Sequence, residues 1–311
     1  MRPSTATLAL LLGSGDGLRV LLPGAEPRRE LTAGPIVSID SRDGVTLAAA
    51  AGQGVWVRRG REWRMTLAGD VRRVRIAPSG LLLAGTAPAA IHVSTDGDRW
   101  EEWSTLQNLL RYHWQRLTNN STARDVGGIA FASGAVVAIT GVGAFLTLDE
   151  GRNWALHSEG LDRQVHGLWE HPERTDRLYA ASPSGFYRSE DGGYSWVQSL
   201  HGLDRSWVWD VAVLPGTPDT LLLSAARRPD GQESALFRSV DGGISWSRVL
   251  LESEDEWAQP PLVCSLTSPV DALFVLAGRR AWGSHDRGDH WMPIADGLPP
   301  ARSFIAAVGD W

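Results

Sequence analysis

A short turn sequence recurs along the chain and restricts the possible folds more than any other feature. Two near copies, SEDGGYSW and SVDGGISW, occupy residues 189–196 and 239–246. Further full-length copies are TLDEGRNW at 147–154 and SHDRGDHW at 284–291; STDGDRW at 94–100 is one residue shorter, and a degenerate copy ends at Trp63. The closing tryptophans are separated by 37, 54, 42, 50 and 45 residues, which suits a repeating unit of four short strands.

The pattern S/T-x-D-x-G-x-x-W predicts a hairpin turn. In the copy at 189–196, the Ser189 hydroxyl and the Asp191 carboxylate can accept hydrogen bonds from backbone N–H groups of the turn. Gly193 can adopt the positive φ that other residues avoid, and Trp196 can fold back over the strands. The aspartates belong to separate turns and cannot converge on one ion, so we expect structural clips and no metal site.

These turns resemble the Asp-box, or BNR, repeat of sialidase-like β-propellers, and the resemblance covers nearly the whole chain. In that family the box lies on the hairpin between the third and fourth strands of each blade. The family includes glycoside hydrolases and also non-enzymatic members, among them the photosystem II assembly factor and the sortilin-type receptors. The resemblance therefore implies a propeller architecture and leaves both kinds of function open.

Two sets of apolar segments around the turns predict seven blades of four antiparallel strands in a single domain, residues 1–311. The expected innermost strands are 35–40, 71–77, 126–131, 165–170, 208–214, 262–267 and 304–308. The expected second strands are 8–12, 46–50, 81–85, 136–140, 178–182, 221–225 and 273–277. Pairing 304–308 with 8–12 would let the N- and C-terminal strands share one blade and close the ring, which hides the sheet edges. Six blades is the alternative.

Composition excludes several kinds of function. The formal net charge of −6 argues against binding to nucleic acid or acidic membranes. All 30 basic residues are arginine, so no lysine can form a Schiff base or a P-loop, and we expect no cofactor.

The single cysteine, Cys264, stands in an apolar stretch and predicts a buried thiol. No segment approaches the roughly 20 apolar residues of a membrane span. We expect a cytoplasmic monomer, with an exported form as the alternative.

Ligand sites favour concave places where several elements converge, and in a propeller these are the connections around the channel mouth. Two such connections, GLDRQVHG at 160–167 and GLDRSWVWD at 202–210, are near repeats, and GLPPARSF at 297–304 is related to them. We therefore predict a binding site for a protein partner, an anionic small molecule or a carbohydrate, formed by Arg124, Arg163, His166, Arg205, Trp207, Trp209 and Arg302.

Each of these candidates also has a purely structural interpretation. The arginines can be loop charges paired with Asp162, Asp204, Asp210 and Glu256. Trp207 and Trp209 lie two apart on a strand, so both can pack one face of a blade instead of contacting a ligand. The spacing of Leu106, Leu109, Leu110, His113 and Leu117 predicts a helix over 105–118 near the mouth, as a cap, a lid or a docking element.

A catalytic set of the sialidase type is incomplete. The resemblance implies three arginines on a substrate carboxylate, here Arg163, Arg205 and Arg302, with a tyrosine–glutamate nucleophile pair. Tyr187 is the one suitably placed tyrosine, and no glutamate is matched to it. We therefore expect a non-catalytic binding propeller, with a sialidase-like glycoside hydrolase or lyase as the alternative.

Overall fold

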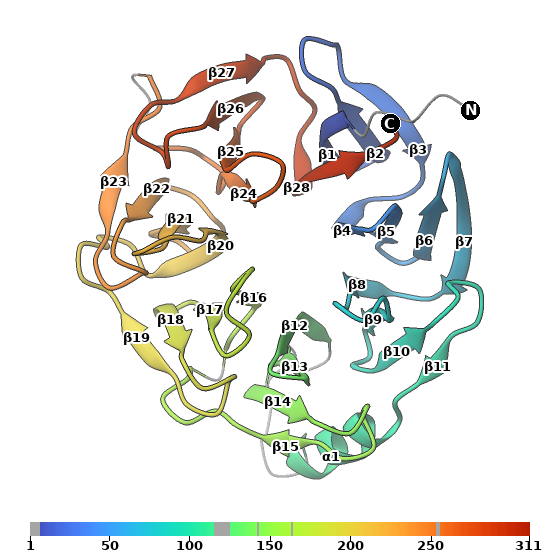
Figure 1. Cartoon of the computed structure of the whole chain (residues 1–311). Coiled ribbons are helices and arrows are strands. Elements are labelled where there is room, and N and C mark those ends of the chain that lie inside the picture. The colour runs from blue at the N-terminus through green and yellow to red at the C-terminus, as the bar shows by residue number, and fades with distance from the viewer. Residues whose placement is uncertain (1–6, 115–124, 142, 163, 253–255) are drawn as a thin grey trace.

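Seven four-stranded antiparallel sheets stand in a ring around a central channel in the computed structural model (Figure 1). The structure describes residues 7–114, 125–141, 143–162, 164–252 and 256–311, without the side chains of 111–114. The chain is a seven-bladed β-propeller, as the strand pattern predicts, and the six-bladed alternative is wrong. In each blade one strand lines the channel and three follow it outward (Figure 1).

Blade 1 contains β28 (Ala301–Gly309), β1 (Thr7–Ser14), β2 (Gly17–Leu21) and β3 (Arg28–Thr32). Blade 2 contains β4 (Ile36–Arg42), β5 (Val45–Ala50), β6 (Gly54–Arg59) and β7 (Glu62–Ala68). Blade 3 contains β8 (Val71–Ile76), β9 (Leu82–Thr86), β10 (Ile91–Ser94) and β11 (Glu101–Glu102). Blade 4 contains β12 (Val126–Ala132), β13 (Ala135–Thr140), β14 (Gly143–Thr147) and β15 (Ala155–Leu156).

Blade 5 contains β16 (Gly167–Glu170), β17 (Leu178–Ser182), β18 (Gly185–Ser189) and β19 (Val197–Ser199). Blade 6 contains β20 (Trp207–Leu214), β21 (Thr220–Ala226), β22 (Ser234–Ser239) and β23 (Ser247–Val249). Blade 7 contains β24 (Leu262–Leu266), β25 (Ala272–Ala277), β26 (Arg280–Ser284) and β27 (Met292–Ala295).

The ring closes in blade 1, where the last strand of the chain pairs with the first. The antiparallel register sets Leu8 opposite Val308 and Leu12 opposite Phe304. This is the predicted closure, and it places an innermost strand from the C-terminus beside three strands from the N-terminus (Figure 1). Closure removes two sheet edges that an open array would expose.

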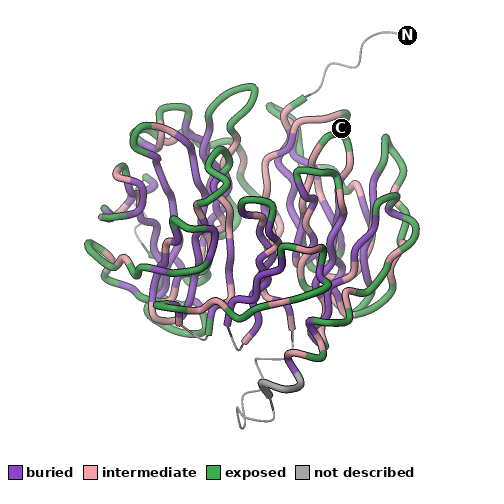
Figure 2. The backbone as a smooth tube through the Cα atoms, turned by 60° about the horizontal axis from the view of Figure 1, so that its bottom comes forward, coloured by how far each residue is buried: buried purple, intermediate pink, exposed green. Residues whose placement is uncertain are grey.

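The hydrophobic core lies between blades rather than within them. Alternate residues of each strand point to opposite faces of its sheet, so every blade packs against both neighbours. Between blades 5 and 6, for example, Tyr179 and Phe186 pack with Leu221, Phe237 and Trp246. The ring of Phe186 meets that of Trp246 edge-on, with centroids 5.0 Å apart. Figure 2 shows the buried strands in purple beneath green loops.

The repeated turns form the hydrogen bonds predicted for them. The N–H of Gly193 donates to Ser189 Oγ at 2.8 Å, and the N–H of Ser195 donates to Asp191 Oδ1 at 2.9 Å. Gly193 has φ of 96°, and the Trp196 ring is 4% exposed. The turns after Thr147, Ser239 and Ser284 repeat the bond from the glycine N–H to the hydroxyl.

Blade 2 departs from this pattern because its hairpin lacks the serine and the aspartate. Arg59 pairs directly with Glu62, and the tight turn is followed by the seven-residue strand β7. In blades 3 to 7 the outermost strands have two to four residues. The outermost strands are thus shorter in the blades that carry the aspartate turn.

The helix α1 (Thr105–Trp114) follows blade 3, at the outer edge of the ring beside β15 (Figure 1). It begins where the sequence predicts, and the predicted extension over 115–118 lies outside the described residues. Leu106 and Leu110 are fully buried and pack with Phe145 of blade 4. Thr105 Oγ1 donates a hydrogen bond to the carbonyl of Gly151. These contacts fit a cap over apolar surface.

Among the described residues, no helix has the length and apolar character to span a bilayer.

The two faces of the ring carry different loops. Because neighbouring strands are antiparallel, the connections between blades lie on the same face as the loops between second and third strands. We call this the channel-mouth face. The repeated turns and the C-terminus lie on the opposite face, which is uppermost in Figure 2.

Candidate functional site at the channel mouth

Three of the predicted site residues lie together at the channel mouth. His166 precedes β16 of blade 5, and Trp207 and Trp209 belong to β20 of blade 6. The ring centroid of His166 is 6.5 Å from that of Trp207, with an interplanar angle of 19°, and 5.9 Å from that of Trp209. We call His166, Trp207 and Trp209 the aromatic cluster. Arg124 and Arg163 lie outside the described residues.

A β-bulge in β20 sets the position of Trp209. Val208 pairs with Ala225 and Asp210 with Ser224, so Trp209 has no partner in β21. The extra residue bends the strand where it reaches the channel mouth. Trp209 is 38% exposed, Trp207 is half-buried and Val208 is fully buried. Trp209 therefore presents an indole surface to solvent, which packing within a blade does not require.

His166 fixes this bulge. Its Nε2 atom lies 2.5 Å from the carbonyl oxygen of Val208. Because a carbonyl only accepts, Nε2 carries the proton and donates it to this bond. Burial lowers the pKa of His166, although its hydrogen bonds to backbone oppose that shift. The imidazole is therefore a neutral brace between blades 5 and 6.

The wall beside Trp209 depends on a glycine that the sequence does not distinguish from other turn glycines. Gly231, between β21 and β22, has φ of 82°. A Cβ atom there would stand 2.6 Å from Pro260 Cδ and 3.7 Å from Trp209 Cζ2. Only glycine lets this loop approach both rings, so Gly231 and Pro260 extend the apolar surface around the aromatic cluster.

Arg205 does not reach the surface. Its side chain has 0% exposure, and Nη1 lies 2.6 Å from Asp204 Oδ1. Nε donates to the carbonyl of Glu233 at 2.6 Å, and Nη2 pairs with Glu256. With its donors directed to three groups of the protein, Arg205 holds loops together. Arg205 is therefore a structural residue and does not belong to the exposed aromatic cluster, although it is only two residues from Trp207 in the sequence.

Three other arginines of this face are also paired with carboxylates, whereas Arg279 donates to the carbonyls of Gly297 and Leu298. Arg72 lies 2.7 Å from Asp70, Arg227 lies 3.1 Å from Asp204, and Arg280 lies 3.2 Å from Asp296. Exposed pairs of this kind add little stability, but they cancel the local field. Arg302, in β28 of blade 1, is exposed and has no ion pair among the described residues. Among the described residues, these ion pairs therefore reduce the positive potential of the arginines that they engage.

Below the aromatic cluster, Asp210 joins two innermost strands. Its Oδ1 accepts the N–H of Val211 and its Oδ2 accepts the N–H of Val263 in β24, each at 3.0 Å. Burial raises the pKa of Asp210 to about 7, against the opposing effects of these N–H groups and of Arg73. Arg73 itself donates to the carbonyl of Gly127 from Nε at 3.0 Å and from Nη2 at 2.6 Å.

Arg75 connects four consecutive blades across the channel wall. From β8 of blade 3 it donates to Asp40 of β4 at 3.0 Å, to the carbonyl of Ile129 in β12 at 3.0 Å, and to Glu170 of β16. Its guanidinium also lies over the ring of Phe131, 5.5 Å from the centroid. Burial disfavours its charge, but Glu170 and Asp40 outweigh that effect and raise the pKa of Arg75. Sequence reasoning missed this network because its members are distant in the chain.

Tyr187 is not arranged as a sialidase-type nucleophile. Its hydroxyl contacts Ser184 Oγ at 2.8 Å and Gln198 Nε2 at 3.2 Å, and the residue is 5% exposed. Ser184 in turn donates to Asp162. No glutamate contacts the Tyr187 hydroxyl among the described residues. The side chains of Tyr187, Ser184 and Asp162 thus link the connection before β16 to the loop between β17 and β18.

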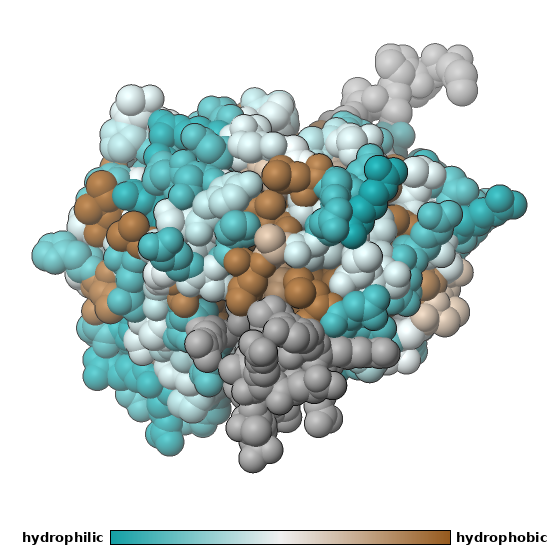
Figure 3. Space-filling view, turned by 90° about the horizontal axis from the view of Figure 1, so that it is seen from below, coloured by the Kyte–Doolittle hydropathy of each residue, from teal (hydrophilic) through white to brown (hydrophobic). Residues whose placement is uncertain are grey.

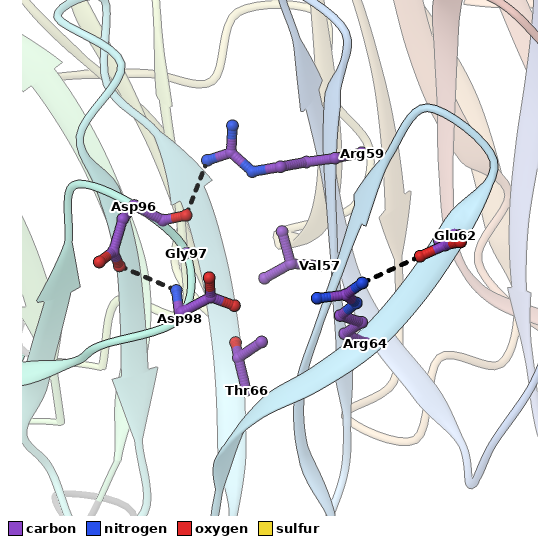
Figure 4. Close-up of a pocket in the computed structure, with 8 residues that line it drawn as sticks. All are labelled: Val57, Arg59, Glu62, Arg64, Thr66, Asp96, Gly97 and Asp98. Carbon is purple, nitrogen blue, oxygen red and sulfur yellow. Dashed lines mark hydrogen bonds and ion pairs between the residues drawn. The ribbon is translucent and has the colours of Figure 1, made fainter.

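Two hollows in the described part of the chain lie between blades at the outer rim, away from the channel mouth. One, of about 370 Å³, lies between the β6–β7 hairpin and the turn of blade 3, and is lined by Val57, Arg59, Glu62, Arg64, Thr66 and residues 96–98 (Figure 4). The other, of about 200 Å³, lies between β19 and the turn of blade 6. No group of three or more histidine, cysteine or acidic side chains in the described ranges is arranged to hold a metal ion.

No known protein family matches the sequence, and no similar sequence was found among curated proteins. Solved structures share the fold. An ancestral GH74 enzyme is 19% identical with a TM-score of 0.64, over 85% of this chain but 39% of that one. YCF48 bound to D1 peptide is 18% identical with a TM-score of 0.58, over 88% of this chain and 90% of that one. The GH74 xyloglucanase from Xanthomonas campestris is 13% identical with a TM-score of 0.61, over 93% of this chain and 46% of that one. At these identities the likeness establishes the β-propeller fold alone.

Proposed function

We propose that the chain is a non-catalytic binding propeller that holds a segment of a protein partner at its channel mouth. The observation that carries this proposal is the aromatic cluster, in which a braced bulge exposes the Trp209 ring. A large, rigid aromatic surface that remains exposed to solvent is typical of an energetic anchor in protein recognition. Among the site residues predicted from sequence, His166, Trp207 and Trp209 are the ones we retain as this anchor.

The charge pattern favours a protein segment over a small anion. Arg72, Arg205, Arg227 and Arg280 are all engaged by carboxylates. Among the described candidates, Arg302 alone is left to recognise a negative group. The structural neighbours support the same choice: YCF48, described in complex with a D1 peptide, matches this chain over 90% of its own length, whereas the GH74 enzyme matches over 39%.

The sequence repeats fit this assignment. We assign the turns closed by Trp100, Trp154, Trp196, Trp246 and Trp291 to the Asp-box type, within a single domain that spans residues 1–311. The serine-to-glycine and aspartate-to-backbone bonds of these turns support the assignment. Their role is to fasten the outer strands, which leaves the channel mouth for binding.

The proposal is tested by selecting peptides from a displayed random library on the wild-type protein, with an excess of the Trp209→Ala variant as competitor. Peptides that bind the mouth are expected to survive this competition and to show affinities at least about tenfold weaker for Trp209→Ala, a loss of about 1.4 kcal/mol. The matched control is Met65→Ser, which alters an exposed apolar side chain on the distant strand β7. Selected peptides that bind Trp209→Ala as well as wild type would refute a mouth site.

A glycoside hydrolase is the second candidate, and Asp210 is the observation in its favour. Its carboxyl group lies in the channel wall in the same strand as Trp207 and Trp209, and burial raises its pKa to about 7, the range of a general acid. Against this, both of its oxygens are occupied by backbone N–H groups. Turnover of fluorogenic glycosides, sialosides included, that disappears in Asp210→Asn would establish the enzyme. No turnover by the wild-type protein would reject it.

A further inference from the structure

Exposed apolar side chains are unevenly distributed around the outer rim. Outside the mouth, the large apolar residues that are most exposed belong mainly to blades 4 to 7, and Met65 is the exception in blade 2. Hydrophobic residues reach the surface at the left of Figure 3, on the side of β19. Five of these exposed residues lie in or beside β15, β19 and the turns of blades 5 and 6, and we call them the rim patch: Leu156, Tyr194, Val197, Leu200 and Ile244.

Three members of the rim patch share one hollow, and the other two lie at the adjoining turn and strand. Val197, Leu200 and Ile244 line the same hollow of about 200 Å³ between β19 and the turn of blade 6. Their exposures are 66%, 41% and 57%. Tyr194, in the turn that leads into β19, is 42% exposed, and its ring centroid lies 4.5 Å from that of His157, the residue after Leu156. Exposed apolar side chains that gather around one hollow are typical of an interaction site.

The turn sequences indicate that the apolar character is specific to these blades. Tyr194 and Ile244 occupy the position two residues before the closing tryptophan. The same position holds Arg152 in blade 4 and Asp289 in blade 7. A polar residue therefore fits this exposed position of the turn, and folding does not require Tyr194 or Ile244 to be apolar.

The equivalent hollow between blades 2 and 3 is polar (Figure 4). There Arg59 donates to the carbonyl of Asp96 at 3.0 Å, and Arg64 pairs with Glu62 at 3.1 Å. It has the larger volume, about 370 Å³, and its lining includes the charged side chains of Glu62, Arg64 and Asp98. Both hollows contain an arginine of the third strand that donates to a carbonyl of the next turn, Arg59 to Asp96 and Arg188 to Gly242 at 2.9 Å. The feature particular to the hollow between blades 5 and 6 is its three apolar side chains, Val197, Leu200 and Ile244.

Charges around the rim patch indicate the chemistry of its partner. The carboxylates of Asp191, Asp241 and Glu159 lie in or beside the turns of blades 5 and 6, and none has an ion pair with an arginine among the described residues. Arg188 lines the hollow and is engaged by Glu190 at 3.0 Å, and Glu190 also engages Arg177 at 2.6 Å. Hydrogen bonds within the turns, above all from Ser195 and Ser245, outweigh burial and lower the pKa of Asp191 and Asp241, which keeps them ionised.

The patch also borders a free strand edge. β19 is the outermost strand of blade 5 and pairs with β18 on one side only. An unpaired edge accepts an extended chain through backbone hydrogen bonds, and the alternate side chains of that chain enter adjacent pockets. An extended occupant fits this edge and the hollow beside it.

We propose that the rim patch is a second docking surface, separate from the channel mouth, for an extended cationic segment of a partner protein. Its apolar side chains would enter the hollow between Val197 and Ile244, and its lysine or arginine side chains would face Glu159, Asp191 and Asp241. Opposite charges across such an edge increase the association rate and select against acidic segments.

The test uses a fluorescein-labelled octapeptide of alternating lysine and valine as the probe, with a glutamate–valine octapeptide as its counterpart. Fluorescence anisotropy should show saturable binding of the lysine peptide only, weakened by salt. The double variant Val197→Ser/Ile244→Ser should raise the Kd at least about tenfold. Glu159→Gln should raise it by a smaller factor. Met65→Ser on β7 and Trp209→Ala at the mouth should leave it unchanged, so a failure here is distinct from a failure of the mouth site.

Because the substituted side chains are exposed, the variants should keep the wild-type melting temperature, and this is measured in parallel. Equal affinity of wild type and Val197→Ser/Ile244→Ser for the probe would overturn the proposal, as would the absence of binding at millimolar peptide. Sedimentation of wild type as a dimer that the double variant converts to a monomer would also overturn it, because a second copy of the chain would then be the occupant.

Discussion

The Nε2 atom of His166 donates a hydrogen bond to the carbonyl oxygen of Val208 across 2.5 Å, which ties a connection of blade 5 to the bulge of β20. The carbonyl belongs to the residue immediately before Trp209, so the imidazole holds the strand in the shape that presents this indole. One short contact between neighbouring blades thus controls the geometry of the proposed binding site.

Replacing His166 with alanine should free the bulge. The carbonyl of Val208 loses its donor, which should lower the free energy of unfolding by about 1–2 kcal/mol. Trp207 and Trp209 should become more mobile, with a red shift of tryptophan fluorescence and a weaker near-ultraviolet circular dichroism signal. His290→Ala is the control, because that side chain is 88% exposed in a turn on the opposite face. Spectra of His166→Ala that match those of wild type would contradict the brace.

Replacing Arg75 with alanine should destabilise the ring more than any exposed arginine substitution. It would leave Asp40 and Glu170 in the channel wall without their common partner, at a cost of about 3–5 kcal/mol. Equilibrium unfolding in urea measures the change, with Arg64→Ala as the exposed control. A loss for Arg75→Ala as small as that for Arg64→Ala would show that the four-blade network does not support the channel.

Asp210 should impose a pH dependence on stability. Its pKa is about 7 in the folded protein and about 3.9 in the unfolded chain, so the folded state binds more protons between these values. Its contribution is therefore present at low pH and is lost as pH rises from about 4 to 7. The difference in melting temperature between wild type and Asp210→Asn, followed from pH 5 to 8, should change in this sense and level off above pH 7. A constant difference across this range would contradict the raised pKa.

The turn tryptophans should contribute to stability without affecting binding at the mouth. Trp246 is 6% exposed and packs on Phe186 of the preceding blade, so Trp246→Ala should cost about 3–5 kcal/mol. Calorimetric unfolding measures the loss. Trp291, a partly buried tryptophan in the equivalent turn of blade 7, should cost less when replaced in the same way. The idea of the turns as clips fails if Trp246→Ala unfolds at the wild-type temperature.

The fold was predictable because short sequence motifs recur along the chain and each one determines its own local structure. Each turn carries its own acceptors and glycine, as the bonds from Gly193 to Ser189 show, and the spacing of the closing tryptophans gives the size of the blade. The pairing of Phe304 with Leu12 followed from counting, since the chain begins with a second strand and ends with an innermost one.

The site was predictable only in part, because its decisive contacts are not local. Sequence position placed His166 and Trp209 on the channel-mouth face, where the structure also has them, but the bulge that exposes Trp209 depends on the register with β21. Arg205 belongs to a near repeat of the His166 loop, yet its guanidinium is buried between Asp204 and Glu256. Nothing in the sequence next to Arg75 indicates that it meets residues of blades 2, 4 and 5.

The affinity of a mouth-selected peptide for wild type, Trp209→Ala and Val197→Ser/Ile244→Ser, measured by isothermal titration calorimetry, tests the central claim most directly. The account predicts a Kd at least about tenfold higher for Trp209→Ala, and wild-type affinity for the rim variant, because binding depends on the braced indole. Equal affinity of wild type and Trp209→Ala, with all three proteins folded, would contradict it.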